Sequence, residues 1–127
     1  MFETIAEITI DRPIEEVFAY IADNENDPQW CVPVVETTRI AGDAPGLGAR
    51  YTFASRLGLM KVRGEFETTG FEAPEAIRWA GESAIVTFSG QYRLTSTAAG
   101  TRLVERSAFE PKRWLKLLQA VMRPTYT

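Results

Sequence analysis

Apolar and polar residues alternate at the start of the chain in the pattern of a half-buried β-strand. From Glu3 to Ile10, small or apolar side chains occupy every second position. Asp11-Arg12-Pro13 then ends the strand, and Pro13 suits the first turn of a helix. Apolar residues return at the spacing of an amphipathic helix, at Ile14, Val17, Phe18 and Ile21. A second, short helix is expected from Pro28 to Trp30.

The middle of the chain alternates in the same way and predicts further strands, separated by turn residues. They are expected at residues 35–41, 49–56, 59–69, 77–80, 83–95 and 101–110. Leu57-Gly58 is expected to form a tight hairpin turn. After Pro111, helical spacing returns and predicts a final helix that ends near Arg123. This order describes a single α+β domain over residues 1–127.

Alternate residues of a strand point to opposite faces of a sheet. The expected antiparallel sheet therefore has one covered face and one solvent-facing face. The covered face collects Tyr51, Phe53, Ser55, Met60, Val62, Gly64, Phe66, Ile77, Trp79, Val86, Phe88, Gly90, Tyr92, Leu94, Leu103, Glu105, Ser107 and Phe109. Only the final helix is long enough to cover it. Gly64 and Gly90 stand in mid-strand, which indicates either a bend in the sheet or room left for a ligand.

Composition and charge narrow the possible functions. The chain is 45% hydrophobic and 24% charged, as in ordinary soluble domains, and its net charge of −3 argues against nucleic-acid binding. It contains no histidine and one cysteine, which excludes Ser-His and Cys-His catalysis and histidine metal ligands. We therefore expect no cofactor and no metal. No apolar run approaches the ~20 residues of a spanning helix, so we expect a cytoplasmic protein without integral membrane association.

The segment Ile8-Thr9-Ile10-Asp11-Arg12-Pro13-Ile14-Glu15-Glu16-Val17-Phe18 resembles the opening of the START-like superfamily. More narrowly, it is similar to the SRPBCC proteins of the polyketide cyclase/dehydratase type. Residues 22–30 and 100–103 continue the resemblance. It implies a helix-grip fold, in which a curved seven-stranded antiparallel sheet wraps around a C-terminal helix, with two short helices between the first and second strands. A cavity separates sheet and helix. Relatives usually continue through a longer final helix, so here the helix is expected to be either short in itself or truncated.

The aromatic residues of the covered face predict a ligand pocket, although each one could simply pack a core. The residues expected to bind the ligand are Trp30, Tyr51, Phe53, Phe66, Trp79, Phe88, Tyr92, Glu105, Ser107, Phe109, Trp114, Leu118 and Met122. Glu105 is the one charged residue expected on this face. It would orient a ligand or act as a general acid or base; alternatively, it turns to solvent or bonds structurally to Tyr92 or Tyr51.

Other motifs do not point to a site. The acidic stretch 23–27 superficially resembles a calcium loop, but Pro28 stands where that loop needs glycine and Val34 where it needs glutamate. Cys31 has no neighbouring base or cation, which favours an inert thiol.

Three functions remain open. The first is binding of a small hydrophobic molecule, such as a lipid, polyketide, isoprenoid or aromatic metabolite, without catalysis. The second is a metal-free cyclase/dehydratase-type enzyme in which Glu105 and pocket tyrosines do the acid–base work. The third is a protein-interaction module. An enzyme needs a convergent polar group in the pocket, whereas a binder does not. The protein is expected to be a monomer or a weak homodimer.

Overall fold

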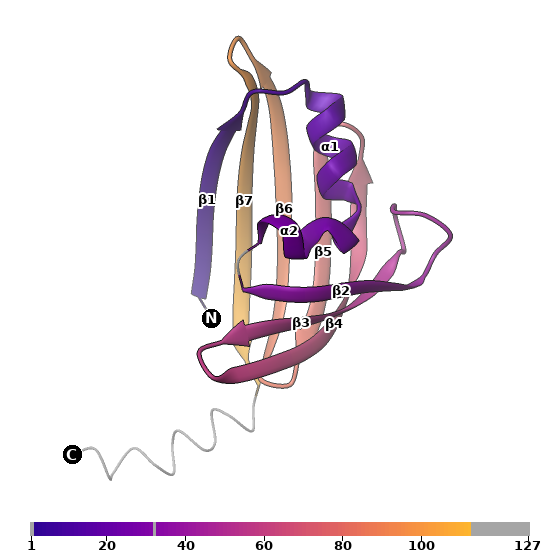
Figure 1. Cartoon of the computed structure of the whole chain (residues 1–127), viewed down its shortest axis with the longest axis vertical. Coiled ribbons are helices and arrows are strands. Elements are labelled where there is room, and N and C mark those ends of the chain that lie inside the picture. Colours follow the sequence, from indigo (N-terminus) through magenta and orange to yellow (C-terminus); the bar gives the residue numbers. More distant parts are fainter. Residues whose placement is uncertain (1, 32, 113–127) are drawn as a thin grey trace, which may run out of the picture.

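The computed structural model describes residues 2–31 and 33–112. The elements are β1 (Phe2–Ile10), α1 (Ile14–Ala22), the 3₁₀ helix η1 (Asn24–Asn26), α2 (Asp27–Trp30), β2 (Val34–Ala41), β3 (Arg50–Leu57), β4 (Met60–Glu72), β5 (Ala76–Ser83), β6 (Val86–Thr97) and β7 (Gly100–Pro111). The strands form one seven-stranded antiparallel sheet in the order β1-β7-β6-β5-β4-β3-β2 (Figure 1). This confirms the predicted sheet and the helices between its first two strands. The expected final helix lies outside the described residues.

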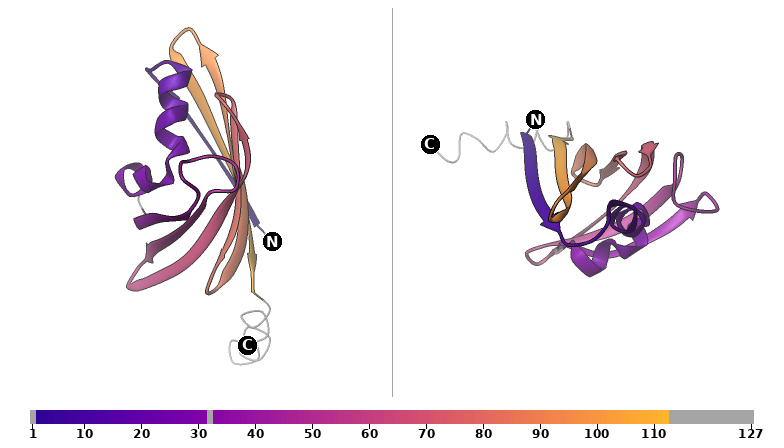
Figure 2. Two further views of the ribbon diagram at one scale, coloured as in Figure 1. Left: turned by 90° about the vertical axis from the view of Figure 1, so that its right-hand side faces the viewer. Right: turned by 90° about the horizontal axis from the view of Figure 1, so that it is seen from above.

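The sheet is strongly curved, and the helices lie on its concave side (Figure 2). Aromatic packing shows how far it bends. The ring centroids of Phe53 on β3 and Phe88 on β6 are 5.6 Å apart, although β4 and β5 lie between them. In a flat sheet, three strand spacings of about 4.8 Å would separate these positions by roughly 14 Å. The concave face therefore brings together side chains from strands that are not neighbours.

Glycines on the concave face make room for aromatic rings on adjacent strands. The cross-strand pairs are Phe53–Gly64, Phe66–Gly81 and Trp79–Gly90. A Cβ atom at Gly90 would overlap the Trp79 ring, and one at Gly64 would lie 2.8 Å from the Phe53 ring. No real Cβ approaches so closely, so each ring occupies the space that a side chain would need. These glycines accommodate the rings and do not themselves leave room for a ligand.

Helix α1 covers one part of the concave face. It begins after Pro13 and carries Glu15 and Glu16 in its first turn, where acidic side chains favour the helix dipole. Its buried residues pack against β5, β6 and β7 in a cluster formed by Val17, Phe18, Ile21, Ala22, Ile77, Tyr92, Leu94 and Leu103. The fully buried Thr101 hydroxyl donates a 2.8 Å hydrogen bond to the Arg12 carbonyl and fixes the β1–α1 corner. The expectation that only the final helix covers the sheet is therefore wrong for this part.

A second cluster lies beside the first on the more strongly bent strands. Ala49, Tyr51 and Phe66 form its buried centre, with Phe53, Trp79 and Phe88 packed against it. Trp79 also packs against the cluster beneath α1. The two clusters are thus joined through one indole ring.

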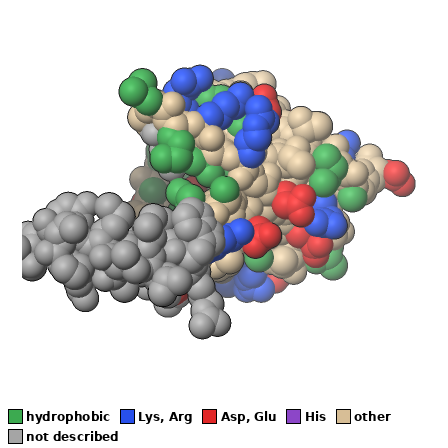
Figure 3. Space-filling model, turned by 90° about the horizontal axis from the view of Figure 1, so that it is seen from below, with side chains coloured by type: hydrophobic (Ala, Val, Ile, Leu, Met, Phe, Trp, Pro, Cys, Tyr) green, Lys and Arg blue, Asp and Glu red, His purple; other side chains and the backbone are tan. Residues whose placement is uncertain are grey.

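The solvent-facing side of the sheet matches the predicted pattern. Figure 3, which views the molecule from below, shows Lys and Arg side chains near Asp and Glu side chains. Cross-strand ion pairs link the two kinds, including Arg50–Glu65 at 2.9 Å and Arg63–Glu36 at 2.8 Å. Among the residues described here, no helix is long and apolar enough to cross a membrane.

Two turns differ from the sequence prediction. The β3–β4 hairpin turns at Gly58-Leu59, one residue later than expected, because the positive φ of +63° falls on Gly58. Met60 follows this exposed tip and is 57% exposed instead of covered. The expected strand 83–95 begins later, at Val86. The Ser83 hydroxyl accepts 3.3 Å hydrogen bonds from the N–H groups of Ile85 and Val86, which closes a turn there.

The first strand is more exposed than its alternating sequence suggests. β1 lies at the edge of the sheet, and only β7 pairs with it. Ile8 faces the same side as Leu103, its partner in register, yet its side chain is 57% exposed. The prediction of a half-buried strand is therefore wrong for β1, because no described element covers this edge.

Candidate functional site

A cavity of about 500 Å³ opens on the concave face, between the segment that carries η1 and α2 and the strands β3 to β7. Its apolar lining consists of Phe2, Pro33, Val34, Phe53, Val62, Phe66, Trp79, Ile85, Val86, Phe88 and Phe109. The remaining lining residues are Asn24, Asp27, Cys31, Thr37, Ser55, Ser83, Ser89, Tyr92, Glu105 and Ser107. This volume is within the range of pockets that bind drug-sized molecules.

The structure brings most of the expected ligand-binding residues to this cavity. Its lining includes Phe53, Phe66, Trp79, Phe88, Tyr92, Glu105, Ser107 and Phe109. Two others lie outside the lining. Trp30 packs on Tyr92 with 6.0 Å between ring centroids, and Tyr51 is fully buried against Phe66 at 5.1 Å. Each therefore packs against an aromatic residue of the lining without itself lining the cavity. Trp114, Leu118 and Met122 are outside the described residues.

An aromatic row forms the apolar floor of the cavity. It consists of Phe66, Phe53, Phe88, Phe109 and Phe2, with successive ring centroids 5.9, 5.6, 6.5 and 5.3 Å apart. These distances are in the range of attractive aromatic pairs. The row crosses from β4 to β1 over the bend, so its continuity depends on the curvature of the sheet. Such a surface suits a flat or ring-containing apolar molecule.

Asp27 contributes a buried carboxyl group that sequence analysis did not single out. It is the first residue of α2, and the Asn24 side-chain amide donates a 3.2 Å hydrogen bond to its Oδ2 atom. Its Oδ1 atom is buried without a hydrogen-bond partner among the described residues. Burial raises the pKa of Asp27 from 3.8 to about 7, and the charges of Asp23 and Glu105 act in the same direction against the hydrogen bond from Asn24. At neutral pH this group therefore exists in both protonation states.

The sequence contained a signal for Asp27. A short helix was expected to begin at Pro28, directly after the acidic stretch, so the carboxyl groups of that stretch were expected to lie next to its first turn. The comparison with a calcium loop considered the stretch only as a metal site. Within residues 2–31 and 33–112, no group of three or more metal-ligating side chains is found.

Glu105 faces the cavity, as predicted. β6 and β7 pair without a bulge, and Tyr92 lies opposite Glu105 in register. The Ser107 hydroxyl donates a 3.3 Å hydrogen bond to Glu105 Oε1. The alternative in which a bulge turns Glu105 to solvent is therefore wrong. The cavity lining thus includes a carboxyl group from β7.

Two further titratable groups of the cavity stay protonated at neutral pH. Burial, together with the charges of Asp27 and Glu105, raises the pKa of the Tyr92 hydroxyl well above 10. The same three causes raise the pKa of the Cys31 thiol to about 11. Cys31 therefore carries no nucleophilic thiolate, in agreement with the expected inert thiol.

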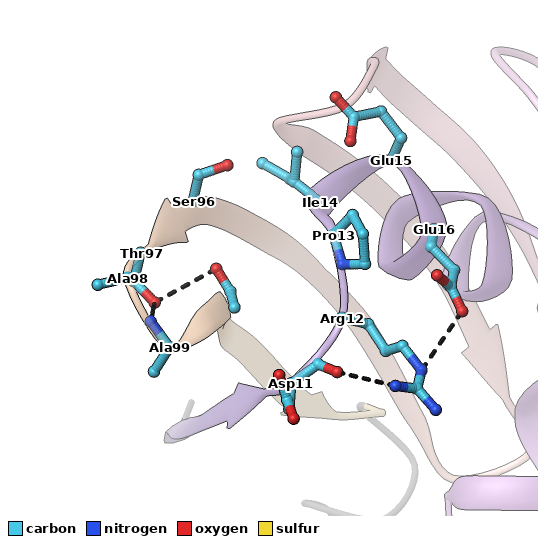
Figure 4. A pocket seen from close by; sticks show the side chains of 11 residues that line it. Asp11, Arg12, Pro13, Ile14, Glu15, Glu16, Ser96, Thr97, Ala98 and Ala99 are labelled. Atoms are coloured by element: carbon cyan, nitrogen blue, oxygen red, sulfur yellow. Dashed lines mark hydrogen bonds and ion pairs between the residues drawn. The ribbon is translucent and has the colours of Figure 1, made fainter.

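A second depression, of about 780 Å³, lies at the other end of the molecule between the start of α1 and the β6–β7 turn (Figure 4). Charged residues and short turn residues line it. They are held by local interactions such as the Arg12–Glu16 ion pair at 3.5 Å and the hydrogen bond from the Thr97 hydroxyl to the Gly100 carbonyl at 3.2 Å. None of the described residues that line it is aromatic. We therefore place the candidate site in the aromatic cavity.

Solved structures share this architecture at low sequence identity. TTHA0849 from Thermus thermophilus is 21% identical, with a TM-score of 0.78 over 98% of this chain and 83% of that one. The Zhui aromatase/cyclase from Streptomyces sp. R1128 is 17% identical, with a TM-score of 0.75 over 87% and 68%. A START superfamily protein from Mycobacterium smegmatis is 10% identical, with a TM-score of 0.75 over 87% and 77%. At these identities the likeness shows the fold alone.

No curated protein matches the sequence. A family model does match, and it covers residues 1–127. Its description, polyketide cyclase / dehydrase and lipid transport, agrees with the superfamily suggested by the opening segment and with the observed sheet. The chain therefore belongs to the polyketide cyclase / dehydrase and lipid transport family.

Proposed function

We propose that the protein binds one small hydrophobic molecule in the concave-face cavity. The observation that carries this proposal is the cavity of about 500 Å³ with a continuous aromatic row as its floor. Burial of apolar ligand surface against these rings supplies the driving force, about 25 cal/mol for each Å² removed from water. The family description, which names lipid transport as well as cyclisation, agrees with this function.

The experiment is a titration with N-phenyl-1-naphthylamine, a neutral aromatic probe that fluoresces in apolar sites. We expect saturable binding with about one probe per chain and a raised melting temperature. A Ser55→Phe substitution places a ring in the cavity and should weaken probe binding at least tenfold. Thr52→Phe adds the same ring to the opposite face of β3 and should leave binding unchanged. Absence of saturable binding by the folded wild-type protein would contradict the proposal.

The paired carboxyl groups favour a second candidate, a cyclase/dehydratase-type enzyme without metal. Asp27 and Glu105 line one cavity, and the raised pKa of Asp27 leaves it able to donate or accept a proton near neutral pH. In a dehydration, a carboxylate would remove the proton next to a ketone, and a protonated carboxyl group would protonate the departing hydroxyl group. The cavity walls would hold the substrate in the reactive conformation.

This candidate is tested by following dehydration of an aromatic β-hydroxy ketone by absorbance. We expect the rate to exceed that of buffer, and Asp27→Asn and Glu105→Gln to lower it at least tenfold while they still bind the naphthylamine probe. Glu105→Gln should affect ligand handling more than folding, since it keeps the shape of the side chain. A wild-type rate equal to that of buffer would contradict catalysis of this reaction class and leave the binding proposal intact.

A further inference from the structure

Several polar side chains line the cavity, and they come from elements far apart in the sequence. Asp27 begins α2, Thr37 lies on β2, and Glu105 lies on β7, yet all three line the same cavity. The cavity lining therefore includes three hydrogen-bonding side chains, those of Asp27, Thr37 and Glu105, in addition to its aromatic floor.

Thr37 is a buried polar side chain without a partner. It is 8% exposed, and it pairs in register with Phe53, so both side chains face the cavity. Its Oγ1 atom has no hydrogen-bond partner among the described residues, and the same is true of Asp27 Oδ1. Buried polar atoms in native proteins are nearly always hydrogen-bonded, so an unpaired one calls for an explanation. Asp27 and Thr37 both line one cavity, so a ligand group that pairs with these two atoms explains why they have no protein partner.

The charges around the cavity indicate what kind of group this is. Of the described residues that line the cavity, two carry carboxyl groups and none is Lys or Arg. The unpaired Asp27 Oδ1 is an acceptor when the carboxyl group is ionised, and the Thr37 hydroxyl both donates and accepts. A bound carboxylate or phosphate would meet like charges with no compensating cation, which is strongly unfavourable away from water. A hydroxyl or amino group would satisfy the carboxylate directly.

We infer that the ligand is a largely apolar molecule that carries a hydrogen-bond donor, a hydroxyl or amino group, bound by Asp27 and Thr37, and that apolar molecules ending in a carboxylate or phosphate are excluded. The inference rests on the proposed binding function and names its ligand class. In the bound state, the apolar part lies on the aromatic row and the donor points to Asp27 and Thr37. Hydroxylated ring compounds and apolar amines share this chemistry, whereas free fatty acids do not.

The test is displacement of N-phenyl-1-naphthylamine at about pH 8 by four naphthalene derivatives that differ only in the end group of a two-carbon side chain. They are 2-ethylnaphthalene, 2-(2-naphthyl)ethanol, 2-(2-naphthyl)ethylamine and 2-naphthylacetate. We expect the alcohol, the amine or both to displace the probe at least tenfold more effectively than the carboxylate. Preference for the alcohol identifies a neutral donor, and preference for the amine identifies a cation; either result supports the inference.

Substitutions of Thr37 and Asp27 test whether these two side chains contact the donor group of the ligand. Thr37→Val keeps the shape of the side chain but removes its hydroxyl, so it should weaken displacement by the preferred donor ligand several-fold and leave 2-ethylnaphthalene unaffected. Thr38→Val makes the same change at an exposed neighbouring position of β2 and should change neither. Asp27→Asn removes the negative charge of this side chain. It should therefore reduce the difference in probe displacement between 2-naphthylacetate and the donor ligands at least fivefold.

The outcomes separate this inference from the proposed function. If the naphthylacetate binds as well as the alcohol and the amine, or if Thr37→Val leaves donor binding unchanged, the inference is overturned while hydrophobic binding stands. If neither the naphthylamine probe nor 2-ethylnaphthalene binds the folded wild-type protein, the proposed function itself fails.

Discussion

Replacement of Asp27 by Asn tests whether the buried carboxyl group of Asp27 destabilises the folded protein. The substitution keeps the size of the side chain and retains an oxygen that can accept the hydrogen bond from Asn24. It removes the negative charge that burial disfavours. We expect the variant to be more stable than the wild type at alkaline pH and equally stable in acid.

The magnitude follows from the two pKa values of Asp27. Burial, with the charges of Asp23 and Glu105, raises the pKa in the folded protein to about 7, against 3.8 ordinarily, although the Asn24 hydrogen bond opposes this. Between these values the folded state holds a proton that the unfolded state has released, so the free energy of unfolding falls as pH rises. At about 1.4 kcal/mol for each pKa unit, the loss reaches about 4 kcal/mol at most above pH 7 and vanishes below about pH 4. The Asp27→Asn variant has no titrating group at this position and does not lose this stability.

The assay is urea unfolding of both proteins, followed by tryptophan fluorescence at about pH 4, 6 and 8. The gain from Asp27→Asn should grow from near zero to about 2–4 kcal/mol over this series. Asp43→Asn, in the exposed β2–β3 connection, serves as the matched control and should follow the wild-type profile. If Asp27→Asn is equally stable or less stable than the wild type at pH 8, the reasoning is refuted. That result would show that interactions in the folded protein offset the loss of hydration of the Asp27 carboxylate.

Three packing predictions follow from the fold. Thr101→Val should cost about 1–3 kcal/mol in urea unfolding, because the Arg12 carbonyl loses the buried Thr101 hydroxyl as its donor; a loss below about 0.5 kcal/mol would contradict this anchor. Gly90→Ala should cost about 1–3 kcal/mol and change the fluorescence spectrum, since its Cβ displaces the Trp79 ring; an unchanged crystal position of that ring would contradict the prediction. Phe18→Ala should cost about 3–5 kcal/mol in thermal or urea unfolding, because Phe18 is 5% exposed beneath α1; a loss under about 1 kcal/mol would show that the helix contributes little.

The fold was largely predictable because its local patterns agree with its global arrangement. The alternation along β3, β4 and β6 identified the concave face, and the helical spacing from Ile14 to Ile21 identified α1. Pairing rules then gave one antiparallel sheet. The role of α1 as a cover was missed, since a short helix and a long one show the same apolar stripe and the sequence does not say which of them lies on the sheet.

The candidate site was predictable only in part. Phe53, Phe88 and Phe109 follow from strand parity, as does Glu105. Period-two counting cannot tell which inward residues reach the cavity and which lie behind another ring, as Tyr51 does. Nor can it show that Gly90 faces an indole ring, because that depends on register between strands. Asp27 begins a helix of four residues, which is too short for a periodicity to mark its buried side.

The position of Trp79 determines how the two parts of the protein unfold. Its ring packs against the cluster under α1 and also against the cluster of the bent strands, and it lines the cavity between them. Neither half can open without loss of contacts in the other, so we expect the two halves to unfold in a single cooperative step. A ligand seated against this ring would then slow amide hydrogen exchange in α1 as well as in β3, although α1 does not line the cavity.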